Sequence, residues 1–240
     1  MMEGTASVAP LVELRNVTLC YEGRIPAVSE LTLTLEAGRI YGLLGPNGSG
    51  KTTLIKLLIG LLEPTAGTIT IGGMPVGDVT KAYVSYLPDK PFLESGMKVE
   101  EAMTMYADFY EDFDMQRAED MLERLRLSKG ERLNRLSKGT LEKVQLILAM
   151  SRRADLYLLD EPMAGVDPAA RDYILETIIS NYDPHATILI STHLISDVEK
   201  MLDEVIMLQY GRLLHKASVE EMRMQRGESI DAIFRKEFKC

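Results

Sequence analysis

The eight-residue stretch Gly45 to Thr52, with the sequence GPNGSGKT, constrains the fold more strongly than any other part of this chain. It follows the apolar run Ile40–Leu44, which predicts a buried strand, and it precedes Thr53–Leu58, which predicts a helix. Glycines let the backbone curl so that N–H groups line one concave space, and the following helix adds its positive N-terminal end. The alternative is a glycine-rich turn with an incidental lysine. The complete GxxxxGK[ST] pattern between a strand and a helix favours a polyphosphate-binding loop.

The polar side chains of this loop have separate predicted tasks. Lys51 supplies a positive charge for the terminal phosphates, and Thr52 offers a hydroxyl to a magnesium ion that bridges them. Thr53 is placed to touch an inner phosphate. The residues expected to bind the phosphates are Gly45, Asn47, Gly48, Ser49, Gly50, Lys51, Thr52 and Thr53.

Composition limits the class of protein. At 240 residues the chain is long enough for one large α/β domain, or for one core with an inserted subdomain. No apolar run approaches the roughly 20 residues needed to cross a bilayer, and residues 1–10 lack the pattern of a secretory signal, so we expect a cytosolic protein. The net charge of −9 argues against non-specific nucleic-acid binding. Cys20 and Cys240 have no metal-site spacing and predict no disulfide framework.

Two kinds of strand are expected from the apolar pattern. Leu11–Cys20 and Leu31–Glu36 alternate apolar and polar residues, which predicts half-buried antiparallel strands at an edge of the domain. Leu156–Leu159 and Thr187–Ser191 are largely apolar runs, as expected of strands buried in a parallel sheet. Further strands are expected at Thr68–Ile71, Tyr83–Leu87 and Val205–Leu208, the last in a hairpin with Leu213–Leu214.

Helices are expected in three further places. Residues 99–153 have a helical apolar period, which predicts an inserted helical region. Asp167 and Pro168 predict the start of a helix, with a capping carboxylate followed by proline. The charged tail after the hairpin predicts one amphipathic helix. One face of the inserted region carries Met103, Tyr106, Tyr110 and Phe113.

Tyr21 stands at the end of a predicted strand, ahead of the glycine-rich loop. Its functional interpretation is an aromatic plate on which an adenine ring stacks. The alternative is a tyrosine that packs against a neighbouring strand, and the sequence leaves both open.

Two carboxylates and a histidine follow buried strands. Asp160 and Glu161 come directly after Leu156–Leu159, and His193 follows Thr187–Ser191. Open α/β sheets bind ligands at the carboxyl ends of their strands. We therefore expect Asp160 to share the magnesium ion with Thr52, and Glu161, which points to another side, to orient or deprotonate an attacking water. His193 is a candidate sensor of the terminal phosphate.

A second motif, Leu136–Thr140 (LSKGT), lies some twenty residues before these acids, at the start of a predicted helix. It resembles the LSGGQ signature, and with the motifs above it makes nearly the whole chain similar to the nucleotide-binding subunits of ATP-binding cassette (ABC) transporters. The resemblance implies ATP and Mg²⁺ as cofactors, with Tyr21 as the adenine-stacking residue, Glu161 as catalytic base and His193 as switch histidine. It also implies a head-to-tail dimer in which Ser137 and Gly139 of one subunit close on ATP held by the other. Residues 164–167 match the loop that joins the two sites.

The chain departs from the family pattern at functional positions. Lys138 and Thr140 replace a glycine and the glutamine of the signature, which adds a charge and removes an amide. Asp89 stands where the family usually has a glutamine that contacts magnesium and the attacking water. Asp89 is therefore a candidate metal residue, with a loop acid that caps a turn as the alternative.

The expected fold class is α/β: a P-loop NTPase core of RecA type with a mainly parallel sheet, an antiparallel β edge and an inserted α-helical subdomain. We expect one domain over residues 1–240, with the core at 1–88 and 154–217, the insert at 89–153 and a helical tail at 218–240.

The expected function is ATP hydrolysis that drives a separate integral membrane subunit, in the direction of export, from the inner face of the membrane. A soluble cassette ATPase that acts on ribosomes, DNA or cofactor assembly is the alternative, and its usual paired cassettes, coiled coils and basic arms are missing here. The second cassette is either a copy of this chain or a related one. The membrane subunit is expected to dock at residues 89–93 and the first inserted helices, where Tyr106, Phe109 and Tyr110 are candidate contacts.

Overall fold

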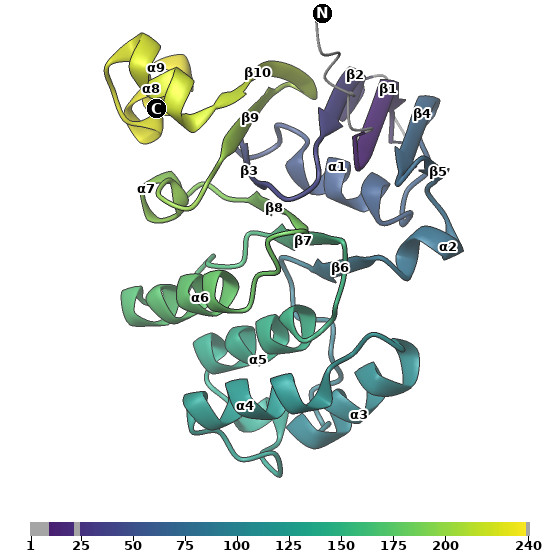
Figure 1. Cartoon of the computed structure of the whole chain (residues 1–240), viewed down its shortest axis with the longest axis vertical. Coiled ribbons are helices and arrows are strands. Elements are labelled where there is room, and N and C mark those ends of the chain that lie inside the picture. Colours follow the sequence, from purple (N-terminus) through teal and green to yellow (C-terminus); the bar gives the residue numbers. More distant parts are fainter. Residues whose placement is uncertain (1–9, 22–24, 239–240) are drawn as a thin grey trace, which may run out of the picture.

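The computed structural model describes residues 10–21 and 25–238 of the chain. It contains a six-stranded sheet, a four-stranded sheet beside it, and a group of helices on the far side of the larger sheet (Figure 1). The expected α/β fold class is therefore confirmed.

The six-stranded sheet has the order β10-β9-β3-β8-β7-β6. Its strands β3, β9, β8, β7 and β6 pair in parallel, and β10 adds an antiparallel edge. Successive residues of each buried strand point to opposite faces of the sheet and so pack in two different hydrophobic cores. Leu43 and Leu158 pack with the four-stranded sheet and α1, whereas Leu44 and Leu159 pack with the helices opposite. The bounds are β3 (Ile40–Leu44), β6 (Val84–Leu87), β7 (Leu156–Asp160), β8 (Thr187–Ser191), β9 (Glu204–Gln209) and β10 (Arg212–Ser218).

The four-stranded sheet has the order β2-β1-β4-β5, and its paired strands run antiparallel. The helix α1 (Lys51–Leu58) lies between this sheet and the larger one (Figure 1), and it buries Leu54, Ile55, Leu57 and Leu58 there. The alternation read from the sequence thus marks strands with one face on a core. The bounds are β1 (Val12–Leu19), β2 (Val28–Leu35), β4 (Ala66–Ile71) and β5 (Met74–Pro75).

The predicted helical period corresponds to α3 (Val99–Phe109), α4 (Met115–Leu125), the 3₁₀ turn η1 (Leu133–Arg135) and α5 (Lys138–Met150). The three aromatic residues expected to contact the membrane subunit, Tyr106, Phe109 and Tyr110, differ in burial. Tyr106 is buried, and its ring makes tilted contacts with Tyr110 and Phe113, so it belongs to the core. Phe109 is 77% exposed. The helix expected after Asp167 is α6 (Pro168–Ser180), and α2 (Asp78–Lys81) and α7 (Ile195–Val198) are single turns.

The prediction of one helix in the tail is wrong. The tail forms two helices, α8 (Val219–Arg226) and α9 (Ile230–Phe238), because Gly227 adopts a left-handed φ of 67° and ends the first. Glu199 next to α7 holds both helices. Its carboxylate accepts hydrogen bonds from the Arg223 guanidinium (2.7 and 2.9 Å) and from the Ile230 amide (2.8 Å). Burial raises the pKa of Glu199, but these bonds outweigh it and leave the pKa below its ordinary value.

Two sequence expectations concern the chain ends. Of residues 1–10, which lack a secretory pattern, the structure describes only Pro10, and Cys240 lies outside the described residues. Within residues 10–21 and 25–238, no helix combines the length and the apolarity needed to cross a bilayer.

Candidate nucleotide-binding and hydrolysis site

The glycine-rich loop connects β3 to α1 at the carboxyl edge of the parallel sheet, and neighbouring backbone crowds it from two sides. A Cβ at Gly45 would lie 2.5 Å from the Leu208 carbonyl oxygen, and a Cβ at Gly50 would lie 2.6 Å from that of Ala27. Gly50 also has a left-handed φ of 106°. The glycines therefore allow the loop to turn tightly and to direct its N–H groups into one space.

Lys51, the first residue of α1, is buried with only 6% of its surface exposed. Its ammonium donates to the Gly45 carbonyl at 2.7 Å and lies 3.8 Å from Glu161 Oε1. Burial lowers the pKa of Lys51, and the carboxylates of Glu161 and Asp160 oppose this shift. The loop thus holds a positive charge that faces two carboxylates.

Asp160 ends strand β7 and is fully buried. Its Oδ1 accepts hydrogen bonds from Thr52 Oγ1 (3.3 Å) and Ser191 Oγ (2.5 Å). Its Oδ2 is buried with no hydrogen-bond partner, as is the hydroxyl of Ser49 in the loop. Burial raises the pKa of Asp160, with the two hydroxyl bonds opposing it. A buried carboxylate oxygen without a partner, beside a threonine hydroxyl, fits the oxygen ligands of a magnesium ion.

The protein ligands at this point are few. Within the described residues, no group of three or more His, Cys, Asp or Glu side chains has the arrangement of a metal site. An ion held by Thr52 and Asp160 therefore needs further ligands from nucleotide phosphates and water, which is how Mg²⁺ is usually bound with nucleotides.

Glu161 has other contacts than Asp160. It leaves the strand with a left-handed φ of 50°, and its amide donates to Ser191 in β8. Its carboxylate lies between two cationic or proton-donating groups: Oε1 is 3.8 Å from the Lys51 ammonium, and Oε2 is 2.8 Å from His193 Nδ1. An Nδ1–H donor at His193 would fix the orientation of the carboxylate. The sequence-based prediction placed the two side chains on different sides because strand residues alternate; in the structure Asp160 contacts Thr52 and Ser191, whereas Glu161 contacts Lys51 and His193.

A hollow of about 400 Å³ surrounds the loop. Tyr21 lies at this hollow, half exposed, with its hydroxyl 3.3 Å from Thr53 Oγ1. Asp89, which follows β6, also lines it. The full lining is Tyr21, Ala27, Asn47, Gly48, Ser49, Gly50, Lys51, Thr52, Thr53, Asp89 and Glu161.

The signature residues lie elsewhere. Ser137 caps the N-terminus of α5, where its hydroxyl accepts from the Thr140 amide at 3.2 Å and lies 2.8 Å from Thr140 Oγ1. The described residues that line the loop's hollow include neither Ser137 nor Gly139. The structure therefore brings the loop together with both acids, His193, Tyr21 and Asp89. The LSKGT motif lies outside this site.

Three residues of the site were missed from the sequence. Ser191 pairs in register with Asp160 and bonds its carboxylate, and Ala27 and Gly211 back the glycine-rich loop. Ser191 had a signal: it is a hydroxyl residue at the carboxyl end of a buried strand. Ala27 and Gly211 act through backbone atoms, which residue type does not reveal.

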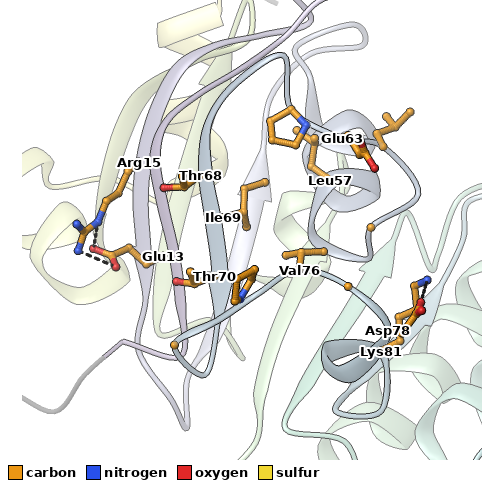
Figure 2. Close-up of a pocket in the computed structure, with 16 residues that line it drawn as sticks. Glu13, Arg15, Leu57, Glu63, Thr68, Ile69, Thr70, Val76, Asp78 and Lys81 are labelled. Carbon is orange, nitrogen blue, oxygen red and sulfur yellow. Dashed lines mark hydrogen bonds and ion pairs between the residues drawn. The ribbon is translucent and has the colours of Figure 1, made fainter.

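A larger hollow of about 780 Å³ lies away from this chemistry, between β4, the end of α1 and α2 (Figure 2). Four of its charged residues form two ion pairs: Arg15 lies 2.8 Å from Glu13, and Lys81 lies 2.8 Å from Asp78. Glu63 also lines this hollow. None of these charged side chains is buried, in contrast to Lys51 and Asp160 of the loop site.

Replacement of Tyr21 by alanine is expected to weaken ATP binding by about 1–2 kcal/mol, close to a tenfold rise in Kd, because a stacking surface for the base is lost. Tyr21→Phe keeps the ring but loses the contact of the hydroxyl with Thr53, so it should bind ATP nearly as the parent does. Titration with a fluorescent ATP analogue measures both. Equal Kd values for Tyr21→Ala and the parent would assign Tyr21 to packing.

A glycine-rich loop between a parallel strand and a helix, with a buried carboxylate on the next strand but one, defines a P-loop nucleoside triphosphatase. The comparisons identify the family. The family model described as "ABC transporter" matches residues 28–164. The chain belongs to the ABC transporter family, and it is the ATP-binding and ATP-hydrolysing subunit of such a transporter.

Individual relatives agree with this assignment. An ABC transporter ATP-binding protein of Nostoc sp. is 34% identical over 231 residues, which cover 92% of this chain and 69% of that protein. The SkfA peptide export ATP-binding protein SkfE of Bacillus subtilis is 31% identical over 221 residues, covering 90% of this chain and 92% of that one. A solved ATP-binding subunit of an ABC transporter superposes with a TM-score of 0.85 at 30% identity, covering 94% of this chain and 98% of that one. These relatives do not support the alternative of a soluble ATPase unconnected with transport.

Proposed function

We propose that this chain hydrolyses ATP with Glu161 as the base, and that hydrolysis drives a separate membrane subunit in the direction of export. The observation that carries the proposal is the placement of the Glu161 carboxylate between Lys51, at 3.8 Å, and His193, at 2.8 Å, beside the loop's hollow. A base must lie within reach of the reacting group and be held in place, and the position of Glu161 beside the hollow, between Lys51 and His193, supports this role.

The ion pair between Lys51 and Glu161 favours a sequence of events on nucleotide entry. The terminal phosphate is a stronger anionic partner for the ammonium than one carboxylate. The Lys51 ammonium would therefore exchange its contact with Glu161 for one with the phosphate. Glu161 Oε1 would then be free to accept a proton from the attacking water. His193 keeps the other carboxylate oxygen in place, and its exposed ring is available to the phosphate.

The magnesium ion is proposed to bind to Thr52 and Asp160, with Asp89 near it in the same hollow. A bound ion supplies charge neutralisation and orientation of the phosphates. The unpartnered Oδ2 of Asp160 supports this assignment, and the shorter reach of Asp89 compared with glutamine favours a contact through water.

We also propose that two cassettes pair head to tail. Ser137 and Gly139 do not line the hollow of their own chain, while the N-terminus of α5 suits a phosphate. They would thus serve ATP held by a second subunit, with residues 164–167 joining the two composite sites in an isologous pair. Thr140, which replaces the glutamine of the signature, contacts Ser137 in this chain: the two hydroxyl oxygens lie 2.8 Å apart.

The proposed dock for the membrane subunit is the groove near residues 89–93 and the start of the insert. A neighbouring hollow of about 280 Å³ is lined by Leu58, Ile59, Leu61, Thr80, Lys81, Val84, Tyr86 and Tyr110. It is connected to residues 89–93 through aromatic contacts, because the Tyr106 ring lies 5.4 Å from that of Tyr110 and 6.4 Å from that of Phe92. Phe92 and Phe109 are 47% and 77% exposed, which supports an apolar contact surface. The chain would then sit on the inner face of the membrane through its partner. The name of the Bacillus relative, a peptide export protein, favours the direction of export.

Purification from detergent-solubilised membranes tests this function. We expect a multi-span membrane protein to copurify in a fixed ratio with the chain and to raise its Mg²⁺-dependent ATPase rate. Lys51→Ala, which removes the phosphate-binding charge, should copurify with the same partner but hydrolyse no ATP. Recovery of soluble partners alone would overturn the proposal.

A further inference from the structure

Arg152, two residues beyond the end of α5, is a charged residue that the chain buries almost completely, with 2% of its surface exposed. Its guanidinium donates three hydrogen bonds: Nε to Asp112 Oδ1 (2.9 Å), Nη1 to the Val84 carbonyl (2.6 Å) and Nη2 to the Ala82 carbonyl (2.7 Å). A buried charge is stable only with such partners. Arg152 thus ties the end of α5 to β6 of the core sheet and to the loop between α3 and α4.

The face of the same guanidinium supports a groove residue. The Arg152 Cζ lies 3.8 Å from the centre of the Tyr110 ring, a cation–π contact. Tyr110 lines the 280 Å³ hollow, which Leu58 and Ile59 at the end of α1 also line. Tyr110 therefore contacts the Arg152 guanidinium and also lines the hollow.

The position of Arg152 matters because α5 is a rigid rod. The helix spans Lys138–Met150, and its 13 residues make it about 20 Å long. Ser137 caps the far end, while Ser85 Oγ also bonds the Ala149 carbonyl near Arg152, at 2.7 Å. A tilt of about 5° at the Arg152 end would move Ser137 by about 2 Å, and misplacement of about 1 Å can reduce catalysis a hundredfold.

We propose that Arg152 is a positioning residue for ATP hydrolysis: through its hydrogen bonds to Asp112, Val84 and Ala82 and its stack with Tyr110, it holds the end of α5 and thereby fixes the placement of Ser137. This inference rests on the proposed function, because it takes Ser137 to close on ATP in a second subunit. If Arg152 had only a structural role, its replacement would lower the melting temperature, the ATP affinity and the subunit pairing together.

The first test measures the position of α5 in the single chain. Cys20 and Cys240 are replaced by serine, and spin labels are attached at Asn134→Cys, before α5, and Thr68→Cys, on β4, both exposed positions. We expect Tyr110→Leu to broaden the distance distribution between the labels, because the ring over the guanidinium is lost. Tyr110→Phe keeps the ring and should retain the parent's distribution. An unchanged distribution in Tyr110→Leu would overturn the proposal.

The second test separates nucleotide binding from subunit pairing in the full chain carrying Glu161→Gln. Arg152→Met and Tyr110→Leu should each raise the dissociation constant of the ATP-bound dimer by about fivefold or more, with the ATP affinity of the single chain unchanged. If Arg152→Met does not fold, as its melting curve would show, Tyr110→Leu gives the answer. A parallel loss of ATP affinity, pairing and melting temperature would assign Arg152 a structural role and overturn the proposal. If ATP does not pair even the parent chains, the head-to-tail function fails, and the label distances alone decide the role of Arg152.

Discussion

Glu161→Gln is expected to lower the ATPase rate by about 10²- to 10⁴-fold, because an amide of nearly the same shape cannot accept the proton of the attacking water. ATP binding should persist, since Lys51 and the backbone of the loop are unchanged. Glutamine also removes the negative charge that lies 3.8 Å from the Lys51 ammonium, so the phosphate would meet less competition for Lys51. The ATP-bound dimer should therefore accumulate. Phosphate release measures turnover, and sedimentation measures pairing.

Asp89→Asn is the matched control for this change. It removes another carboxylate from the same hollow, whereas the contacts with Lys51 and His193 belong to Glu161. We expect it to lower turnover by less than about tenfold, because a water-mediated metal contact contributes less than the base. Unchanged turnover in Glu161→Gln would remove Glu161 from its assigned role, and a larger loss in Asp89→Asn would exchange the two assignments.

Gly139→Asp is expected to abolish turnover in the paired state, because it places a carboxylate where the signature would meet the phosphates of the other subunit. The single chain should still bind ATP, since Gly139 does not line its own loop's hollow. An aspartate in the first turn of α5 also suits the positive end of the helix, so the fold should be retained. ATP affinity and ATPase rate, measured on the same sample, separate the two effects.

Mixing two inactive chains gives the sharper version of this experiment. Lys51→Ala disables the loop and Gly139→Asp disables the signature, so a mixed head-to-tail dimer contains one site with both parts intact. Random pairing of equal amounts makes half of the dimers mixed, and one of two sites in each is intact, which predicts about a quarter of the parental activity. Absence of any recovery would contradict pairing between copies of this chain in the proposed geometry.

The fold class followed from local patterns because each pattern reports its own burial. Alternation at residues 11–20 marked β1, which has one buried face, and apolar runs at 156–159 and 187–191 marked strands covered on both faces. The tail prediction failed because amphipathic periodicity continues across Gly227, whereas the left-handed turn there ends α8.

The sequence also predicted where the main residues of the candidate site lie. Motif spacing placed Lys51, Thr52, Asp160 and Glu161 at strand ends, and parallel strands present those ends at one edge. It did not reveal how the site is supported: Ser191 under Asp160, or the carbonyl of Ala27 against Gly50. These contacts join segments that lie far apart in the chain, and no local period records them.

The sequence by itself determined which residues carry charge and phosphate affinity, because glycine, lysine and carboxylate at those spacings have few other uses between a strand and a helix. Only the tertiary structure decided where Glu161 faces, that Tyr21 reaches Thr53, and that a buried Arg152 connects α5 to β6. The physical reason is that side-chain type fixes the chemistry available to a residue, whereas its partners are chosen by the packing of distant segments.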